Sequence, residues 1–391
     1  MTQFAPPTPP PAPRGRVLVA MSGGIDSSVA AVLLHEQGYE VVGMTMKTWD
    51  YASAGGSKKE TGCCSLDSIN DARQIAVDLG FPHYIIDIRE EFGDFVISNF
   101  TEEYLAGRTP NPCVLCNTHI KWDALLRRAD QLGCEFIATG HYAQVRHENG
   151  RYVISKGLDE NKDQSYALWG VSQQSLARTL FPLGKMRKTE IYDEARRRGF
   201  TELVNKPESY EICFIPDNDY RGFLRRRVPG LEARVSGGKF VLRDGTVLGT
   251  HEGYPFYTIG QRKGLGVALG YPAYVTEIRP DANEVVLGNF DDLASSRTTV
   301  SKLNMGKFAS LEGMGLVPSR TKVRYNHNGG AAAFLEQIGD KIHVYFEEPV
   351  HAVTPGQAAV FYDGEDVIGG GWIERHTIGE TPVSSATAAV L

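Results

Sequence analysis

The sequence predicts an α/β domain built on a doubly wound parallel sheet, followed by two sets of short strands with the turn spacing of small β barrels. Three observations support this prediction. Apolar runs alternate with helical patterns as far as residue 140. A turn rich in glycine and serine, residues 21–28, joins the first strand to the first helix. From Gly237 onward, short alternating strands are separated by Gly-rich turns.

The α/β half has a regular order of elements. Strands are predicted over 17–20, 39–46, 81–88 and 136–140, and helices over 29–34, 65–79, 91–104 and about 117–132. Residues 50–62 are polar and Gly-rich, and they are expected to form a mobile loop. Doubly wound sheets bind ligands at the carboxyl ends of their strands, so the residues that follow each strand are the candidates for a site.

The second half is expected to be all β. Strands are predicted over 239–242, 254–259, 273–278 and 285–287, and then over 322–325, 331–337, 341–346, 357–362 and 367–374. We therefore divide the chain into a disordered Pro-rich arm (1–15), the α/β domain (16–218), a central β domain (219–292), a C-terminal β domain (293–378) and a disordered tail (379–391).

Composition limits the classes of function. The chain has 391 residues and a net charge of −6, which argues against indiscriminate binding to nucleic acid but not against a local basic face. No apolar run approaches the length of a membrane span. Six cysteines in a chain of this size do not make a secreted disulfide framework. Their clustering indicates functional thiols in a reducing compartment, and we expect a cytoplasmic protein without a membrane partner.

The turn at residues 21–28 has the composition of a phosphate-binding loop. Glycines let the backbone approach a ligand, and the amides and dipole of the following helix attract anions. The lysine of a Walker-type loop is absent. The pattern Ser22-Gly-Gly-Ile-Asp26-Ser27 instead resembles the loop of enzymes that split ATP between the α- and β-phosphates, and Asp26 is placed to orient Mg²⁺. The alternative is an ordinary turn between a strand and a helix.

Three cysteines are candidates for chemistry. Cys113 and Cys116 flank the start of a predicted helix, whose dipole is expected to lower the pKa of a thiol. Cys213 lies almost a hundred residues further on, among apolar residues. The alternative is that all three are small buried hydrophobes. Zinc is not indicated, because no second metal-binding pair of residues completes a set of four ligands.

The segment 185–234 holds 12 Lys/Arg against 9 Asp/Glu. These basic residues either bind phosphates or form a solvated face.

Taken together, these residues resemble one family, the tRNA-specific 2-thiouridylases of the MnmA type. Nine motifs match in order across nearly the whole chain. They are residues 21–28 (MSGGIDSS), 46–49 (MKTW), 107–112 (GRTPNP), 116–121 (CNTHIK), 138–142 (ATGHY), 161–166 (NKDQSY), 212–215 (ICFI), 258–266 (TIGQRKGLG) and 354–357 (TPGQ). The resemblance implies an ATP-pyrophosphatase domain, a small central β domain that contacts tRNA and a C-terminal β-barrel.

The resemblance also implies roles for individual residues. Cys116 is expected to be the nucleophile and Cys213 the carrier of a persulfide, with Asp26 acting at the nucleotide. The expected ATP site consists of Ala20, Met21, Ser22, Gly23, Gly24, Ile25, Asp26, Ser27, Met46 and Gly140. The expected contacts with the target base and the rest of the tRNA are Asn111, Pro112, Cys113, His141, Lys162, Asp163, Gln164, Arg324, Tyr325 and Gln357. The implied reaction is ATP-dependent 2-thiolation of the wobble uridine, with Mg²⁺ and with sulfur from a relay protein or a cysteine desulfurase.

One residue departs from the commoner pattern of the family. That pattern reads Asn-Pro-Asp where this chain has Asn111-Pro112-Cys113. Cys113, Cys116 and Cys213 would offer three thiolates to a [4Fe-4S] cluster with one open iron, as in the related tRNA 2-thiocytidine enzymes. Sulfur would then travel either as a protein persulfide or on the cluster. The competing functions are a 2-thiocytidine-type sulfurtransferase and a non-catalytic nucleotide- and tRNA-binding module with a redox role.

Overall fold

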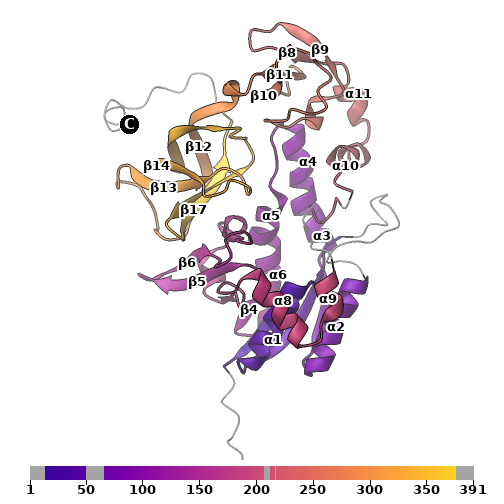
Figure 1. Ribbon diagram of the computed structural model, residues 1–391, viewed down its shortest axis with the longest axis vertical. Helices are drawn as coiled ribbons and strands as arrows, with labels where there is room; N and C mark the ends of the chain where they lie inside the picture. The colour runs from indigo at the N-terminus through magenta and orange to yellow at the C-terminus, as the bar shows by residue number, and fades with distance from the viewer. Residues whose placement is uncertain (1–13, 50–65, 207–211, 216, 376–391) are drawn as a thin grey trace, which may run out of the picture.

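The computed structural model describes residues 14–49, 66–206, 212–215 and 217–375. The predicted Pro-rich arm up to residue 13, the loop 50–62, Cys63 and Cys64, and the tail from 376 lie outside the described residues. Within the described part, no helix has both the length and the apolar character needed to cross a bilayer. Figure 1 shows the α/β domain at the bottom, the central domain at the upper right and the barrel at the left.

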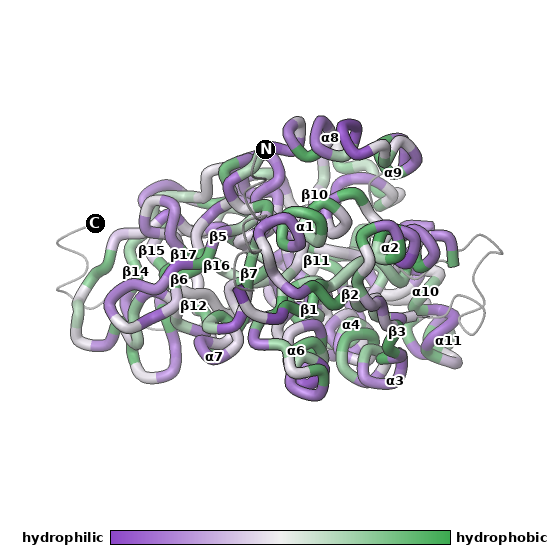
Figure 2. The backbone as a smooth tube through the Cα atoms, turned by 90° about the horizontal axis from the view of Figure 1, so that it is seen from below, coloured by the Kyte–Doolittle hydropathy of each residue, from purple (hydrophilic) through white to green (hydrophobic). Residues whose placement is uncertain are grey.

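A five-stranded parallel sheet in the order β3-β2-β1-β4-β7 forms the centre of the α/β domain. Its strands are β1 (Arg16–Ala20), β2 (Glu40–Lys47), β3 (His83–Asp87), β4 (Phe136–Ala138) and β7 (Thr179–Leu180). Figure 2 shows α1 (Ile25–Glu36) and α2 (Leu66–Leu79) on one face and α6 (Trp122–Gln131) on the other. Because both faces are covered, the side chains at the centre of β1 are fully buried, as in other doubly wound sheets.

Two long helical segments carry a π-helical stretch in their middle. The first runs through α3 (Arg89–Phe92), η1 (Gly93–Ile97) and α4 (Ser98–Leu105), and the second through α5 (Pro112–Leu115), η2 (Cys116–Lys121) and α6. Asn111 caps the second segment by accepting a hydrogen bond from the Val114 amide, and Pro112 takes the first helical position. Cys116 therefore begins a π-helical turn, a feature that often marks functional sites.

The chain from residue 143 to 235 connects the three domains. A hairpin of β5 (Ala143–Glu148) and β6 (Arg151–Lys156) leaves the α/β domain and pairs with the barrel strand β17. The helical turns η3 (Ser165–Leu168) and α7 (Gln173–Leu176) follow, and then α8 (Lys188–Arg197) and α9 (Thr201–Asn205). Helix α8 packs on α1. Helices α10 (Tyr220–Arg227) and α11 (Leu231–Val235) lead into the central domain.

The two β domains complete the fold. The central sheet has the order β10-β11-β8-β9, formed by β8 (Gly238–Val241), β9 (Val247–His251), β10 (Tyr274–Arg279) and β11 (Glu284–Gly288), with the turn η4 (Tyr254–Phe256). After η5 (Asp291–Leu293), six strands close into a barrel because β12 pairs with both β15 and β17. They are β12 (Ala294–Met305), β13 (Val317–Lys322), β14 (Ala331–Ile338), β15 (Lys341–His351), β16 (Ala358–Asp363) and β17 (Asp366–Ile373).

The structure confirms the predicted fold class and corrects several elements. The helix predicted from residue 117 begins at Pro112, because the Asn-Pro pair is a helix start rather than a loop. The strand predicted over 254–259 is wrong: a 3₁₀ turn with Pro255 occupies its beginning. The strand predicted over 322–325 is the end of β13, so Arg324 and Tyr325 lie in the turn that follows. The hairpin β5–β6, strands β9 and β12, and helices α8 to α11 were not predicted.

An ion-pair network fastens the hairpin β5–β6 to the barrel. The Arg146 guanidinium donates to both oxygens of Asp366, each at 2.6 Å, and the hydroxyl of Ser155 and the Nζ of Lys307 donate to the same carboxylate, each at 2.9 Å. Asp366 is buried. Hydrogen bonds from Arg146 above all, and also from Lys307 and Ser155, hold the pKa of this carboxyl well below its usual range.

We predict that Asp366→Asn lowers the free energy of unfolding by about 2 kcal/mol at pH 7, because the buried carboxylate has four donors while Arg146 is partly in water. Since the folded pKa is depressed, this contribution is fully present above about pH 4, the usual pKa of an aspartate, and is lost as the pH falls towards the folded pKa. Urea unfolding of both proteins between pH 7 and pH 3 measures the difference.

Glu148→Gln is the matched control, because Glu148 pairs with the same arginine at 2.9 Å but its side chain is 45% exposed. We expect it to change the stability by less than about 0.5 kcal/mol. Equal effects of the two substitutions would contradict the role given to Asp366.

Candidate active site

The turn between β1 and α1 has the geometry of an anion site. Gly24 is the N-cap of α1 in extended conformation, and it provides no side chain that caps the first-turn amides. The hydroxyls of Ser27 and Ser28 turn back to the Gly24 carbonyl at 3.1 and 2.9 Å, and Ser27 also accepts a hydrogen bond from the Ser22 amide. The serines therefore fix the shape of the loop, while the amides and dipole of a twelve-residue helix face its open side.

Two glycines allow this loop to pack closely against its neighbours. Gly23 has a φ of +70°, and a Cβ atom there would lie 1.9 Å from the Ser68 carbonyl oxygen on α2. A Cβ atom on Gly140, just beyond β4, would lie 2.8 Å from the backbone nitrogen of Ser27. Met46 lies at the end of β2, beside β1 in the sheet. The loop, Met46 and Gly140 thus come together at the carboxyl edge of the sheet, as predicted.

Asp26 is engaged by two residues that the sequence analysis did not single out. The Lys188 Nζ donates to its two oxygens at 2.8 and 2.9 Å, and the Tyr142 hydroxyl donates to Oδ1 at 2.6 Å. Lys188 is 7% exposed, whereas the Asp26 side chain is 34% exposed. Lys206 lies on the other side of the loop, where its Nζ contacts Asp71 at 2.7 Å and Ser68 at 2.9 Å. Both lysines belong to the basic segment 185–234, and that segment was the signal in the sequence for either of them.

A second group of predicted residues gathers beside this loop. Gln164 accepts a hydrogen bond from the Tyr142 amide at 3.0 Å, and the Tyr325 hydroxyl donates to the Asp163 carbonyl at 3.3 Å. The side chain of Asn111 interacts with the Tyr166 hydroxyl. The thiol of Cys113 lies close enough to the Tyr325 hydroxyl and to the Lys121 ammonium for each of these groups to affect its neighbour's pKa. Residues from the α/β domain and the barrel therefore line one site.

Asp163 and Arg324, two of the predicted tRNA contacts, make hydrogen bonds within the protein. The buried carboxylate of Asp163 accepts hydrogen bonds from the amides of Gly157 and Ser165 at 3.2 and 3.0 Å. The Arg324 guanidinium donates to the His351 carbonyl at 3.0 Å. Asp163 and Arg324 therefore have structural roles, while Tyr325 remains 47% exposed.

Gln357 positions the loop that leads into the helix start at Asn111 and Pro112. Its amide nitrogen donates to the carbonyls of Thr109 and Pro110 at 3.1 and 2.8 Å, and the Thr109 amide donates to the Pro355 carbonyl at 2.9 Å. Gly356 has a φ of +87° and lies so close that a Cβ atom would be 2.9 Å from the Thr109 carbonyl oxygen. The barrel turn 354–357 thus docks directly on the loop that carries Asn111 and Pro112.

His141 is held as a neutral imidazole. Its Nδ1 lies 2.7 Å from the Thr139 hydroxyl, and its ring packs near Trp122 and Phe181. Burial, together with the positive charge of Lys121, lowers the pKa of His141 to about 3. At neutral pH this side chain offers a hydrogen bond or a packing surface rather than a charge.

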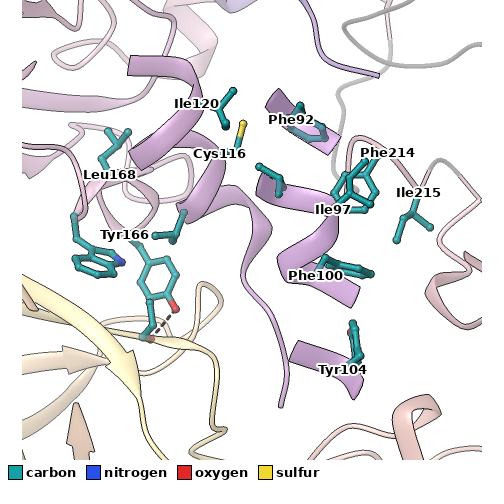
Figure 3. Close-up of a cluster of buried hydrophobic side chains, with 14 of the residues drawn as sticks. Phe92, Ile97, Phe100, Tyr104, Cys116, Ile120, Tyr166, Leu168, Phe214 and Ile215 are labelled. Atoms are coloured by element: carbon teal, nitrogen blue, oxygen red, sulfur yellow. Dashed lines mark hydrogen bonds between the residues drawn. The ribbon is translucent and has the colours of Figure 1, made fainter. Parts of the chain in front are cut away.

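The thiols differ in their surroundings. Cys113 lies at the surface, yet desolvation by the protein around it raises the pKa of its thiol, and the charge of Lys121 offsets this only in part. The lowered pKa that the helix start predicted is therefore wrong for Cys113, because desolvation outweighs the charge of Lys121. Cys116 is buried, and Figure 3 shows its sulfur facing Phe92.

Cys213 lies beside the α3–α4 segment, which carries Phe92, on a different side from Cys116. It is exposed, and the adjacent Phe214 packs edge-on against Phe92 and Phe100, at ring distances of 5.8 and 5.2 Å. Figure 3 shows Phe214 on one side of the α3–α4 segment and Cys116 on the other side of it. Both thiol-bearing segments therefore contact one helical segment.

The three thiols do not form a ligand set in this structure. Over the described ranges, no group of three or more His, Cys, Asp or Glu side chains is arranged to hold a metal ion. Cys116 points into an apolar cluster, whereas Cys113 and Cys213 lie at the surface. The predicted cluster site of Cys113, Cys116 and Cys213 does not fit these positions.

The comparisons with known proteins identify the family. The family described as tRNA methyl transferase HUP domain matches residues 15–217, tRNA methyl transferase PRC-barrel domain matches 223–289, and Aminomethyltransferase beta-barrel domain matches 307–373. The tRNA-specific 2-thiouridylase MnmA of Amoebophilus asiaticus is 74% identical over 361 residues, 92% of this chain and 96% of the relative. The MnmA proteins of Cytophaga hutchinsonii and Salinibacter ruber are 72% and 58% identical, over 92% and 96% of this chain and 98% of each relative.

The chain belongs to the MnmA family of tRNA-specific 2-thiouridylases. This finding confirms the family that the nine motifs indicated. The MnmA domain order also agrees with the structure, in which a parallel-sheet domain precedes a central β domain and a closed barrel.

We predict that Gln357→Ala loosens the loop 107–113 of this MnmA protein. Two hydrogen bonds from the barrel to the loop carbonyls are lost, so amide hydrogen exchange at Thr109 should become at least tenfold faster. Gln337→Ala is the control, because Gln337 bonds to Ser310 and Leu311 at the far side of the barrel. Unchanged exchange at Thr109 in the Gln357 variant would show that the barrel does not position the loop.

Proposed function

We propose that this protein carries out ATP-dependent 2-thiolation of the wobble uridine of tRNA, as a tRNA-uridine 2-sulfurtransferase. The observation that supports this most directly is the contact of two sites at residues 139–142. Gly140 packs on the phosphate loop, Tyr142 binds Asp26, and Gln164 of the second site binds the Tyr142 backbone. A nucleotide in the first site and a base in the second would be neighbours, as transfer of AMP requires.

The phosphate loop supports the first step. Uridine O2 is a poor leaving group, and adenylation converts it into a good one. The amides at the start of α1 suit the phosphates of ATP, with Met46 and Gly140 as flanking residues. Mg²⁺ would be held by Asp26 together with the phosphates, because Mg²⁺ in proteins is commonly bound by one or two carboxylates plus substrate phosphates, and it would stabilise their charge.

The second site supports binding of an extruded base. A helix starts at Asn111, Pro112 and Cys113, beside Tyr325 of the barrel. The neutral His141 lies near Lys121, as does Cys113. RNA-modifying enzymes flip their target nucleotide out of the stack and place it against aromatic and polar side chains. Two of the matching family descriptions mention methyl transfer. No feature among the described residues of this site favours methyl transfer over adenylation.

We assign sulfur transfer to Cys116 and Cys213, which lie on the two segments that contact the α3–α4 segment. The terminal sulfur of a persulfide on Cys213 attacks C2 of the adenylated uridine, the C–O bond to AMP breaks, and AMP leaves with the electron pair. The Cys116 thiolate then attacks the Cys213 sulfur, which leaves a Cys116–Cys213 disulfide and releases the 2-thiouridine. A thiol reductant resets the pair. Cys213 is the exposed member, which suits loading by a sulfur-relay protein or a cysteine desulfurase, and a reducing cytoplasm suits both thiols.

The basic run of α10 is only partly available to tRNA. Arg225 pairs with Glu232 and Glu252, each at 2.7 Å, and stacks over Phe256. Arg226 and Arg227 are exposed, as are Arg262 and Lys263 of the 258–266 motif. We propose that these exposed residues, with Lys162 and Tyr325, contact the tRNA backbone, and that Arg225 stabilises the central domain.

We predict that Cys116→Ser and Cys213→Ser each abolish formation of 2-thiouridine, while the first turnover of pyrophosphate release in the presence of tRNA and ATP stays within about threefold of the wild type, because neither thiol acts in adenylation. Mass spectrometry of the wobble nucleoside and a pyrophosphate assay make the two measurements. Cys134→Ser is the control, since Cys134 is buried away from the site. Full thiolation by either variant would overturn the persulfide route.

We predict that Cys113→Asp, which restores the commoner triplet of the family, keeps thiolation with a persulfide donor. A raised pKa keeps Cys113 largely protonated, so it is not needed as a thiolate. The variant and the wild type should have equal activity and no iron after anaerobic purification. Iron, sulfide and visible absorption in the wild type, all lost with activity in the variant, would instead establish the cluster route.

A further inference from the structure

Lys188 has the features of a phosphate-binding residue that the loop itself lacks. The loop 21–28 contains no lysine, although ATP brings several negative charges to it. Lys188 enters from the first residue of α8, more than 150 residues further along the chain, and its Nζ reaches the first turn of α1. The cation therefore lies at the same helix end whose amides face the anion site.

Lys188 and Asp26 differ in how deeply they are buried. Lys188 is 7% exposed and its ammonium lies near the rings of Tyr142 and Tyr192, at 5.9 and 5.1 Å from their centres. Its backbone amide donates to Asp159 at 2.9 Å, which fixes the start of α8. Asp26 is the more open partner, with its side chain 34% exposed. A ligand entering the loop would meet the carboxylate from the solvent side, with the ammonium directly behind it.

A buried ammonium keeps its charge only with a partner, so Lys188 cannot simply lose Asp26. Binding of ATP with Mg²⁺ would supply a new partner to both Lys188 and Asp26. Asp26 would hold the metal and Lys188 would bind phosphate oxygens, so that neither charge would be left unpaired. Lys206 also reaches the loop, because its Nζ donates to the Gly23 carbonyl at 3.5 Å, but its carboxylate partner Asp71 lies on α2, so a metal bound at Asp26 would not displace that ion pair.

We propose that Lys188 is a further phosphate-binding residue of the adenylation reaction, and that its ion pair with Asp26 is exchanged for the phosphates of ATP when nucleotide and Mg²⁺ bind. The proposal rests on the ATP-dependent function proposed above. It assigns two states to Asp26: a partner of Lys188 in the absence of nucleotide, and a ligand of Mg²⁺ in its presence. Tyr142 stays bonded to the carboxylate and holds it at the loop.

The test compares full-length Lys188→Met with Lys185→Met. Lys185 is the same residue type three positions earlier, is exposed and is part of neither site. Calorimetric titration with ATP and Mg²⁺ should show at least a tenfold weaker affinity for the Lys188 variant and a change within twofold for the control. Affinity for tRNA should stay within twofold in both variants. Equal ATP affinity of the Lys188 variant and the wild type would overturn the proposal.

A second comparison separates partner exchange from a structural ion pair, and it also serves if Lys188→Met fails to fold. Asp26→Asn releases Lys188 from its competing partner, so ATP without Mg²⁺ should bind this variant several times more tightly than the wild type. The double variant Asp26→Asn/Lys188→Met carries neither charge and should bind at least tenfold more weakly than Asp26→Asn. Equal affinities of these two variants would mean that Lys188 does not bind phosphate.

The two proposals fail in different ways. If the wild type binds ATP and releases pyrophosphate with tRNA, but Lys188→Met does so equally well, only the role of Lys188 is wrong. If the wild type binds no ATP in the presence of Mg²⁺, the proposed function is wrong and the role of Lys188 is wrong with it.

Discussion

The close approach of Gly140 to the first turn of α1 is the constraint on which the site depends. The distance leaves no room for a Cβ atom, so the backbone beyond β4 lies directly against Ser27 and Asp26. This contact sets the position of Tyr142, which reaches Asp26, and of His141, which faces the other side near Lys121. His141 and Tyr142, two neighbouring residues after β4, thereby connect the loop 21–28 to the proposed site of the base.

The barrel completes the second site instead of lying apart from it. Its turn 354–357 holds the Thr109 and Pro110 carbonyls, and Tyr166 of the α/β domain donates to the Ala358 carbonyl of β16 at 2.9 Å. Tyr325 contributes an aromatic ring from the turn after β13. Because each domain provides only part of the lining, the geometry of the site is determined by how the domains dock.

Local signals explain what the sequence predicted well. The alternation of apolar runs and helices is a property of short segments, so the parallel sheet and the phosphate loop could be predicted from residues 17–140. Contacts between distant segments could not. Nothing near Lys188 indicates that it pairs with Asp26, and Gln357 resembles an ordinary barrel residue until its bonds to Thr109 and Pro110 are seen. The hairpin β5–β6 was missed because its pattern is short and mixed, and its pairing partner lies two hundred residues further on.

The hairpin β5–β6 has a consequence for how the chain can be divided. The strands belong by sequence to the α/β domain, yet β6 pairs with β17 and Asp366 binds residues from both strands. A truncated protein that ends before the barrel would leave the edge of β6 without its neighbour and Arg146 without its carboxylate. Unpaired strand edges recruit other strands, so such a fragment would tend to aggregate. The barrel therefore covers the edge of β6, in addition to its contacts with the loop that precedes Asn111.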